Sequence, residues 1–338
     1  MLAPILVTGA TGFLGRAIVS QAISGSIPLK TTGRKNLVEP LPNFVSVDLA
    51  DETLSSAQLD ELVAGTRCVI HAAGLAHQFD ATAGDYTRFH RLNVDAPVQL
   101  AEAAARQGVK RFVHVSSIKV YNPSCPQPIH EQTPLDPIGP YAQSKAEAET
   151  KLFKVAERAG LEVVALRMAV IYGEEDGGNV ARLISAIDRG RFVMVGRGEN
   201  LKSLIYRGDA ARACLAVASC AELPTSQRAY NIAADPVSMR EIVETIYQAL
   251  GRRRYRLHMP ASCVQFPFAT LARLRMPVVS RKAEKVSETL SKWLVDDAYD
   301  GALFRKDFHF QPQVSLASGI QNEVAWYRGQ DRSRSKAA

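Results

Sequence analysis

The chain alternates short apolar runs with longer segments whose apolar residues recur every three or four positions. The run Ile5–Thr8 has the length of a buried strand, and Phe13–Ser24 has the periodicity of a helix. Similar runs predict strands at 28–32, 43–47, 67–71, 111–116 and 161–168, with helices at 52–63, 92–106 and 141–159. Strands that alternate with helices indicate a parallel sheet covered on both faces, so we expect an α/β fold with a Rossmann-like doubly wound sheet.

This alternation changes after Tyr172. Helices at 180–189 and 208–219 are predicted among shorter strands, and residues 228–232 predict one strand that returns to the sheet. We therefore expect a dinucleotide-binding domain over 1–172 and a smaller mixed α/β substrate lobe over 173–330. The polar and charged residues 331–338 predict a disordered tail.

Composition places the chain among ordinary globular proteins, because 46% of its 338 residues are hydrophobic and 22% are charged. No apolar run reaches the length of a membrane span, and the chain enters its first strand without a signal-peptide pattern. The five cysteines lack zinc-site or CxxC spacing, so we expect reduced thiols, no metal and a cytoplasmic location. The net charge of +7 suits a phosphate-bearing ligand, whereas sparse aromatics near the basic clusters argue against nucleic acid.

Three glycines separate the first strand from the first helix. Gly9, Gly12 and Gly15 form a GxxGxxG version of the dinucleotide-binding fingerprint. Gly9 would allow the turn, Gly12 would let the backbone approach a pyrophosphate, and Gly15 would let the helix pack on the strand. An ordinary strand–turn–helix is the alternative.

The end of the second strand bears on which dinucleotide binds. A site for NAD usually has an acid about 20 residues past the glycines, but here Arg34 and Lys35 occur and no acid precedes Glu39. Two cations suit a 2′-phosphate, which favours NADP over NAD, unless both are solvated loop charges. Asp48, after the third strand, is placed to accept from an adenine amino group or to cap the next helix.

A tyrosine and a lysine provide the strongest catalytic pattern. Tyr141 and Lys145 are four residues apart, which places both side chains on one face of a helix. A free tyrosine has a pKa of about 10, and we expect the lysine charge to lower it enough for proton transfer beside a hydride transfer. Ser117, just past the fifth strand, would hold the substrate oxygen, unless it caps backbone groups at the strand end.

Together these residues resemble the extended short-chain dehydrogenase/reductases of the NAD-dependent epimerase/dehydratase family. The resemblance also includes 69–73, 93–94, 116–121, 166–167, 171–173, 230–232 and 312–326. It implies that Tyr141 is the acid/base, that Lys145 also binds the nicotinamide ribose and that Ser117 orients the substrate. It further implies cofactor contacts from Gly9, Thr11, Gly12, Phe13, Leu14, Gly15, Arg34, Asp48, Leu49, Ala72, Ala73, Gly74, Asn93, Tyr141 and Lys145.

Most relatives of this type act on nucleotide-linked sugars, so the resemblance implies a substrate of that class, with UDP as the favoured nucleotide. Asn179 matches a position that often contacts the diphosphate, although it could equally be a helix N-cap. His77 could face the substrate or lie on a surface loop. Such relatives often form homodimers through two helices, and the corresponding helices carry apolar residues that are compatible with this: Leu100, Ala103, Ala104, Ala146, Leu152 and Val155.

Departures from the family pattern narrow the chemistry. Sugar-nucleotide dehydratases carry acids directly after the Ser/Thr, whereas Ile118 and Lys119 follow Ser117 here. The segments 116–120 and 294–327 are similar to reductases of UDP-4-keto-6-deoxy-N-acetylhexosamines in O-antigen pathways. We therefore expect a nucleotide-sugar reductase, with three alternatives: a UDP-sugar 4-epimerase, a 3β-hydroxysteroid- or flavonoid-type dehydrogenase, and a non-catalytic dinucleotide-sensing regulator.

Overall fold

The computed structural model describes residues 3–35, 37, 40–75, 87, 89–225, 227–253, 258–259 and 295–337. The chain forms two compact units, of which the first comprises Met1–Ile171, Ile205–Ala234 and Tyr299–Val314, and the second the remainder. The first boundary lies within one residue of the predicted one. Two later segments, 205–228 and 299–314, also belong to the first unit, whereas the sequence places them in the substrate lobe.

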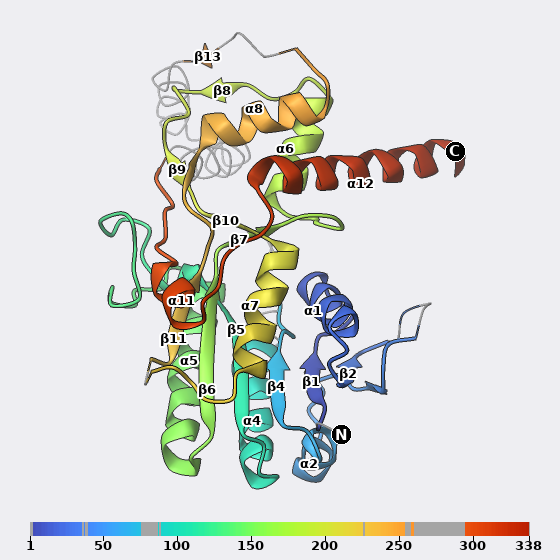
Figure 1. The fold of residues 1–338 in the computed structure, drawn as a ribbon, viewed down its shortest axis with the longest axis vertical. Helices are drawn as coiled ribbons and strands as arrows, with labels where there is room; N and C mark the ends of the chain where they lie inside the picture. The colour runs from blue at the N-terminus through green and yellow to red at the C-terminus, as the bar shows by residue number, and fades with distance from the viewer. Residues whose placement is uncertain are drawn as a thin grey trace, which may run out of the picture. The chain divides into compact units, whose positions relative to one another are not determined.

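A parallel sheet of seven strands forms the centre of the first unit (Figure 1). Its strand order is β11-β6-β5-β4-β1-β2-β3, and every pairing along it is parallel. The strands are β1 (Ile5–Thr8), β2 (Leu29–Gly33), β3 (Phe44–Ser46), β4 (Cys68–His71), β5 (Arg111–Ser117), β6 (Glu162–Met168) and β11 (Ala229–Ile232). The predicted doubly wound Rossmann-like fold is therefore confirmed, and each predicted strand lies within one residue or two of its observed bounds.

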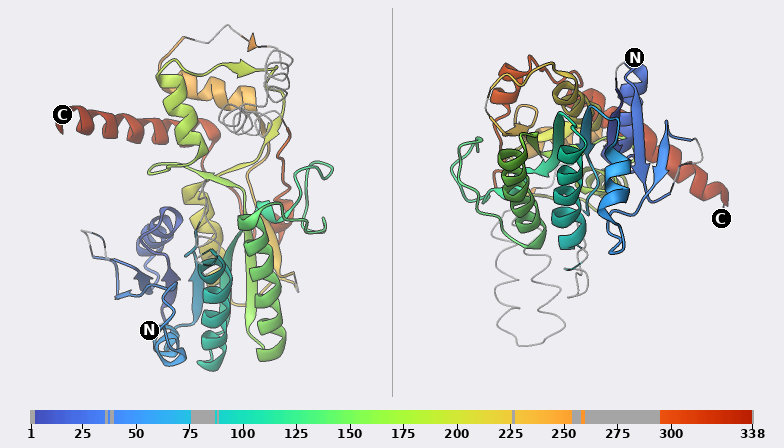
Figure 2. Two further views of the ribbon diagram at one scale, coloured as in Figure 1. Left: turned by 180° about the vertical axis from the view of Figure 1, so that it is seen from behind. Right: turned by 90° about the horizontal axis from the view of Figure 1, so that it is seen from below.

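Helices cover both faces of this sheet (Figures 1 and 2). On one face lie α1 (Phe13–Ser24) and α7 (Arg207–Ser219); on the other lie α2 (Ser56–Val63), α4 (Ala96–Arg106) and α5 (Pro140–Ala159). The sheet separates two apolar clusters because side chains alternate along a strand: Val113 of β5 joins the α1/α7 cluster, whereas Phe112 joins the α4/α5 cluster. Short helical turns, η1 (Arg91–Asp95) and η2 (Ile118–Val120), precede α4 and follow β5.

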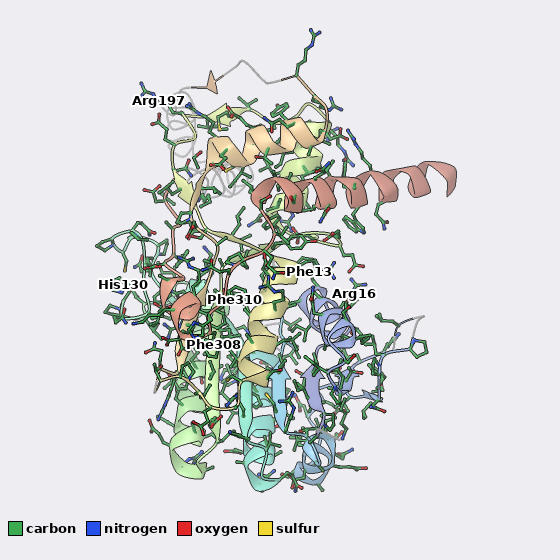
Figure 3. All side chains as sticks on the ribbon, viewed as in Figure 1. Phe13, Arg16, His130, Arg197, Phe308 and Phe310 are labelled. Carbon is green, nitrogen blue, oxygen red and sulfur yellow. The ribbon has the colours of Figure 1, made fainter. Side chains whose placement is uncertain are left out.

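An aromatic cluster holds the returning segment 299–314 in the first unit. This segment contains α11 (Ala302–Asp307), and the rings of Phe304 and Phe308 stack with centroids 4.7 Å apart. The ring of Phe304 also meets Tyr230 of β11 edge-on at 5.6 Å, and Phe310 packs on Phe304 at 5.2 Å. Figure 3 labels Phe308 and Phe310.

The second unit is built mainly from α6 (Asn179–Asp188), α8 (Met239–Ala249) and α12 (Leu316–Ala337), which pack against one another. Short strands accompany them: β8 (Met194–Val195), β9 (Leu201–Lys202), β12 (Val237–Ser238) and β13 (His258–Met259). Two more, β7 (Val170–Tyr172) and β10 (Leu204–Tyr206), pair with each other and belong mainly to the first unit. The helix α12 continues to Ala337, into the segment for which the sequence predicts a disordered tail, and that disorder stays a prediction. Its last turns contain Arg, Lys and Ala, which favour helix.

The described cysteines are free thiols. Cys68 and Cys214 are buried, Cys125 and Cys220 are partly exposed, and Cys263 lies outside the described residues. Among the described helices, none combines the length and apolar character that a bilayer crossing needs.

Candidate active site

At each of the three glycines of the β1–α1 turn, an added side chain would come too close to neighbouring backbone atoms. Gly9 has a φ of +67°, and a Cβ there would lie 2.7 Å from the Ala73 backbone nitrogen. A Cβ on Gly15 would collide with the Gly9 carbonyl oxygen, and one on Gly12 would lie 3.1 Å from the same oxygen. Gly15 thus allows α1 to pack directly on the turn, as predicted.

The N-terminus of α1 is arranged to receive an anion. Gly12 is its N-cap, no side chain caps the helix, and its first turn carries no acid. The first N–H groups of a helix lack internal partners and carry the positive end of its dipole. A smooth glycine backbone beside this terminus fits the pyrophosphate of a dinucleotide.

Two predicted cofactor residues flank this turn. The guanidinium of Arg207 lies over the Phe13 ring, 5.1 Å from its centroid, and Figure 3 labels Phe13. Leu14 is 8% exposed and belongs to the α1/α7 core cluster. Their neighbour Thr11 faces Gly33, because a Cβ on Gly33 would lie 3.0 Å from the Thr11 hydroxyl oxygen. There is consequently little room for an acidic side chain at Gly33.

The end of β2 presents the two predicted cations to solvent. Arg34 and Lys35 are exposed, and the Ser46 hydroxyl donates to the Arg34 carbonyl oxygen at 2.9 Å. This contact fixes the Arg34 backbone and leaves its side chain outward. The exposure of Arg34 and Lys35 fits both predicted alternatives: side chains that bind a 2′-phosphate, and charges that are solvated.

Asp48 does not cap the helix that follows. Its carboxylate accepts a hydrogen bond from Ala50 N at 3.0 Å, whereas Ser55 is the N-cap of α2 and forms a capping box with Gln58. The capping alternative is therefore wrong, and the predicted start of the helix at 52 is too early because the cap lies at Ser55. Asp48 is exposed and Leu49 is buried beside it.

Ser117, Tyr141 and Lys145 meet at the carboxyl end of β5. Lys145 is 5% exposed, and its ammonium donates to the Val115 carbonyl oxygen at 2.9 Å. The Ser117 hydroxyl oxygen accepts from Lys119 N at 3.2 Å, so the serine also caps η2. The same side chain forms a hydrogen bond with Tyr141. The structure thus brings the predicted triad together and shows the capping contact of Ser117, whereas its contact with a substrate oxygen stays a prediction.

The pKa values in this triad differ from the expectation. Burial raises the pKa of Tyr141, and the hydrogen bond with Ser117 offsets this only in part. Burial also lowers the pKa of Lys145 to about 8, against an opposing attraction by Glu149. The predicted lowering of the Tyr141 pKa is therefore wrong in direction, because desolvation outweighs the hydrogen bond with Ser117. Tyr141 is therefore a protonated phenol at neutral pH.

Asn93 supports the site through hydrogen bonds to neighbouring protein groups. Its side-chain oxygen accepts from Leu75 N at 2.9 Å, and its amide donates to Leu75 O and to the Ser144 hydroxyl, both at 3.1 Å. These bonds tie the loop after β4 to α5. Within that loop, a Cβ on Gly74 would lie 3.4 Å from the Lys145 ammonium. Ala72 and Ala73 reach back to Thr8, whose carbonyl and hydroxyl accept from their amides.

Sequence analysis missed a buried polar network below the triad. Glu149 and Arg167 form an ion pair of 2.7 Å, with side-chain exposures of 1% and 6%. The Ser116 hydroxyl donates to Glu149, and Arg167 donates to the Tyr121 hydroxyl at 2.6 Å. One feature of the sequence could have indicated this network: Glu149 follows Lys145 by four residues on a predicted helix, which places both on one face. Removing one partner of such a pair costs about 3–5 kcal/mol.

Of the two further substrate residues that the sequence predicts, the structure describes one, Asn179. Asn179 is the exposed first residue of α6, in the second unit, and Gly178 is the N-cap; the N-cap alternative for Asn179 is therefore wrong. Asp176 accepts from Gly178 N at 2.7 Å and so serves this helix end. His77 lies outside the described residues.

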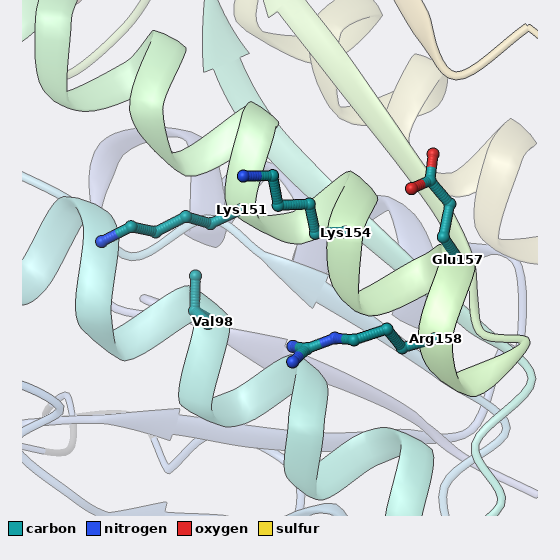
Figure 4. A pocket seen from close by; sticks show the side chains of 5 residues that line it. All are labelled: Val98, Lys151, Lys154, Glu157 and Arg158. Carbon is teal, nitrogen blue, oxygen red and sulfur yellow. The ribbon is translucent and has the colours of Figure 1, made fainter.

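The apolar residues cited for a dimer interface face inward. Leu100, Ala103, Ala104, Leu152 and Val155 belong to the core between the sheet and helices α4 and α5, and Ala146 belongs to the other cluster. The outer surface of these helices carries a shallow pocket lined by Val98, Lys151, Lys154, Glu157 and Arg158 (Figure 4). Using the inward residues as support for a dimer was wrong, and the homodimer stays a prediction.

Comparisons with known proteins agree with the family resemblance seen in the sequence. A model of the NAD dependent epimerase/dehydratase family matches residues 5–233. The chain is 28% identical over 260 residues to the N-acetyl-alpha-D-glucosaminyl-diphospho-ditrans,octacis-undecaprenol 4-epimerase of Escherichia coli O157:H7, covering 76% of this chain and 75% of that one. It is 29% identical over 338 residues to the 2-alkyl-3-oxoalkanoate reductase of Stenotrophomonas maltophilia, covering 94% and 97%.

The fold resembles a structure solved with nucleotide sugar and cofactor. MoeE5 in complex with UDP-glucuronic acid and NAD superimposes with a TM-score of 0.74 at 24% identity, covering 97% of this chain and 99% of that one. This likeness extends over both units and concerns the fold.

Proposed function

Because the chain belongs to the NAD-dependent epimerase/dehydratase family and is an enzyme of the extended short-chain dehydrogenase/reductase type, we propose that it reduces the keto group of a nucleotide-linked sugar. The substrate that fits best is a UDP-4-keto-6-deoxy-hexosamine, and the reductant is NADPH. The observation that carries this proposal is the meeting of Tyr141, Ser117 and Lys145 at the carboxyl end of β5.

A protonated phenol is the form needed to complete a reduction. When bound, the reduced nicotinamide supplies a hydride to the keto carbon. The Tyr141 hydroxyl gives its proton to the oxygen of that carbonyl, which becomes an alcohol. The Ser117 hydroxyl donates to the same oxygen as negative charge develops on it. The ammonium of Lys145 then stabilises the phenolate left on Tyr141.

The residues after Ser117 argue against loss of water from the sugar. Ile118 is 1% exposed and lies in the apolar core, so it cannot be a proton-transferring group. Lys119, which follows it, carries no carboxylate. Dehydration needs an acid and a base on adjacent sugar carbons, and these two positions supply neither.

The choice of NADPH rests on the end of β2. Gly33 replaces the acid that would hold a ribose 2′-hydroxyl, and Arg34 and Lys35 follow it. A guanidinium can bind a phosphate through two parallel hydrogen bonds. NAD remains the competing cofactor, because the family is described as NAD-dependent.

The second candidate is a 4-epimerase of a diphosphate-linked sugar. The relative from E. coli O157:H7 favours it, since its name describes such a reaction. Epimerisation begins with removal of a proton from the sugar hydroxyl. Tyr141 would accept that proton, so the reduction and the epimerisation would use the same hydroxyl in opposite directions.

The test uses purified protein with NADPH and UDP-4-keto-6-deoxy-N-acetylhexosamine. We expect one equivalent of NADPH to be oxidised for each C4 alcohol formed, measured by absorbance and by NMR of the sugar. Interconversion of UDP-N-acetylglucosamine or of polyprenyl-diphospho-N-acetylglucosamine without net NADPH oxidation would instead establish an epimerase. Oxidation of NADPH with a 2-alkyl-3-oxoalkanoate, and not with the sugar, would overturn the nucleotide-sugar proposal.

A further inference from the structure

A chain of buried side chains runs below the site from α5 to β11. Both oxygens of Glu149 are engaged: Oε1 accepts from the Ser116 hydroxyl at 2.5 Å, and Oε2 from Arg167 Nη2 at 2.7 Å. Arg167 Nη1 donates to the Tyr121 hydroxyl at 2.6 Å, and that hydroxyl donates to the Asn231 side-chain oxygen at 2.9 Å. These five residues are between 0% and 5% exposed.

Glu149 is placed to act on the catalytic groups from two directions. On α5 it follows Lys145 by one turn and Tyr141 by two, so the three side chains share a face of the helix. On β5 it binds Ser116, the residue immediately before Ser117. One carboxylate therefore connects the helix that carries the acid/base pair with the strand end that carries the serine.

The other titratable groups near Lys145 are either neutral or positively charged, so they do not attract its ammonium. His71 of β4 and His114 of β5 stack with centroids 5.8 Å apart, and both are fully buried. Burial, with a smaller contribution from Lys145, lowers the pKa of His71 to about 3 and that of His114 well below its usual value, so neither is charged near neutral pH. Tyr141 is protonated, and the nearby Arg167 is cationic. Among the described groups that act on Lys145, Glu149 supplies the attraction.

We propose that Glu149 is a positioning residue for the reduction: its buried carboxylate, one helical turn from Lys145, attracts that ammonium and, through Ser116, fixes the strand end at Ser117. Arg167 orients the carboxylate in return through their ion pair. Within this arrangement Glu149 touches neither substrate nor cofactor and works entirely through Lys145 and Ser116. The inference rests on the proposed function, because it assigns a role within that reaction.

The test separates charge from shape with two matched variants. Glu149→Gln keeps the side-chain shape and removes the charge, whereas Glu149→Asp keeps the charge and shortens the reach to Ser116. The first readout is the alkaline limb of NADPH binding against pH, followed by cofactor fluorescence. The second is NMR titration of lysine labelled with ¹³C at Cε in the free protein, with the Lys145 signal assigned from Lys145→Arg. Neither readout requires turnover of a sugar, so failure of the proposed reaction leaves this test intact.

In the unchanged protein, we expect the alkaline limb of NADPH binding near pH 8. In Glu149→Gln the limb should lie lower by about one pH unit or more. In Glu149→Asp it should move little. An unmoved limb in a folded Glu149→Gln protein would overturn the proposal. If that variant does not fold, the neutral pair Glu149→Gln/Arg167→Met replaces it. Its limb should lie below that of the unchanged protein, because Lys145 loses its nearer charge partner. An equal or higher limb would contradict the inference.

Discussion

The ammonium of Lys145 donates a hydrogen bond to the carbonyl oxygen of Val115, 2.9 Å away. Val115 lies two residues before Ser117 on β5, and Lys145 lies one turn after Tyr141 on α5. This bond joins the strand that carries the serine to the helix that carries the acid/base pair. An ammonium has three protons, so the contact is compatible with a further bond to a ribose hydroxyl.

Replacing Tyr141 by phenylalanine should abolish proton donation and leave the helix in place. We expect turnover of the keto-sugar to fall by about 10²-fold or more, with NADPH binding retained. Steady-state kinetics and a fluorescence titration measure the two effects. Tyr327→Phe is the matched control, because its hydroxyl contacts Asp188 in the second unit and its loss should leave the rate near that of the unchanged protein. Near-full activity of Tyr141→Phe would remove the tyrosine from the mechanism.

A methyl group at Gly12 should obstruct the anion site at the start of α1. The added Cβ would lie 3.1 Å from the Gly9 carbonyl oxygen and would occupy the path of a pyrophosphate. We expect Gly12→Ala to raise the Kd for NADPH by about tenfold or more, since a shift of 1.4 kcal/mol suffices for that factor. Gly177→Ala serves as control, because no atom lies within 4 Å of its added Cβ. Equal affinity in the two variants would place the dinucleotide elsewhere.

Arg34 should distinguish the two dinucleotides. If its guanidinium binds the 2′-phosphate, Arg34→Ala should weaken NADPH binding by about tenfold, the size of a lost charge-assisted hydrogen bond. NADH binding should not change, because NADH lacks that phosphate. Isothermal titration with both cofactors gives the comparison, and the exposed Arg253→Ala controls for net charge. A protein that binds NADH more tightly than NADPH before any substitution would refute the cofactor assignment.

A buried acid in the second unit should make stability depend on pH. Glu323 is fully buried, and its Oε2 accepts from Gly173 N at 3.1 Å. Burial, with the neighbouring Asp176, raises its pKa from 4.5 to about 9. The folded state therefore binds this proton more tightly than the unfolded state does, and stability falls as pH rises between those values.

Glu323→Gln should remove this dependence. We expect the free energy of unfolding to increase by up to about 5 kcal/mol at pH 8, because the unfolded chain has lost this proton there and each pH unit above 4.5 contributes about 1.4 kcal/mol. It should change little at pH 5. Thermal melts at the two pH values test this. The exposed Glu222→Gln is the control. A variant destabilised equally at both pH values would show that the acid is needed only for packing.

Periodicity and turn chemistry predict most of the first unit. The bounds of α1 match their prediction and those of β11 differ by one residue, since a glycine turn or a polar segment marks their ends. Helical spacing places Tyr141 and Lys145 on one face, and the preceding glycine fingerprint gives that pair its catalytic interpretation. These features depend on residues that are close together along the chain, so the sequence alone is enough to predict them.

Features that depend on tertiary packing are not visible in this way. Leu100 and Leu152 each lie on the apolar face of a helix, but periodicity does not indicate whether the sheet or a partner subunit covers that face. The sign of the Tyr141 pKa shift depends on burial, which spacing does not give. The role of Asn93 requires knowing that Leu75 and Ser144 are its neighbours, 18 and 51 residues away along the chain.

The return of segment 299–314 to the first unit affects how the protein can fold during synthesis. Asp209 on α7 accepts hydrogen bonds from Gln313 N and Val314 N at 2.9 and 3.0 Å, and α7 covers the sheet beside α1. The cofactor-binding unit is thus incomplete until nearly the whole chain has left the ribosome. A nascent chain that ends at 171 exposes the sheet face that α7 later covers, so it is expected to need chaperone protection. For the same reason, expression of that fragment alone should give aggregates.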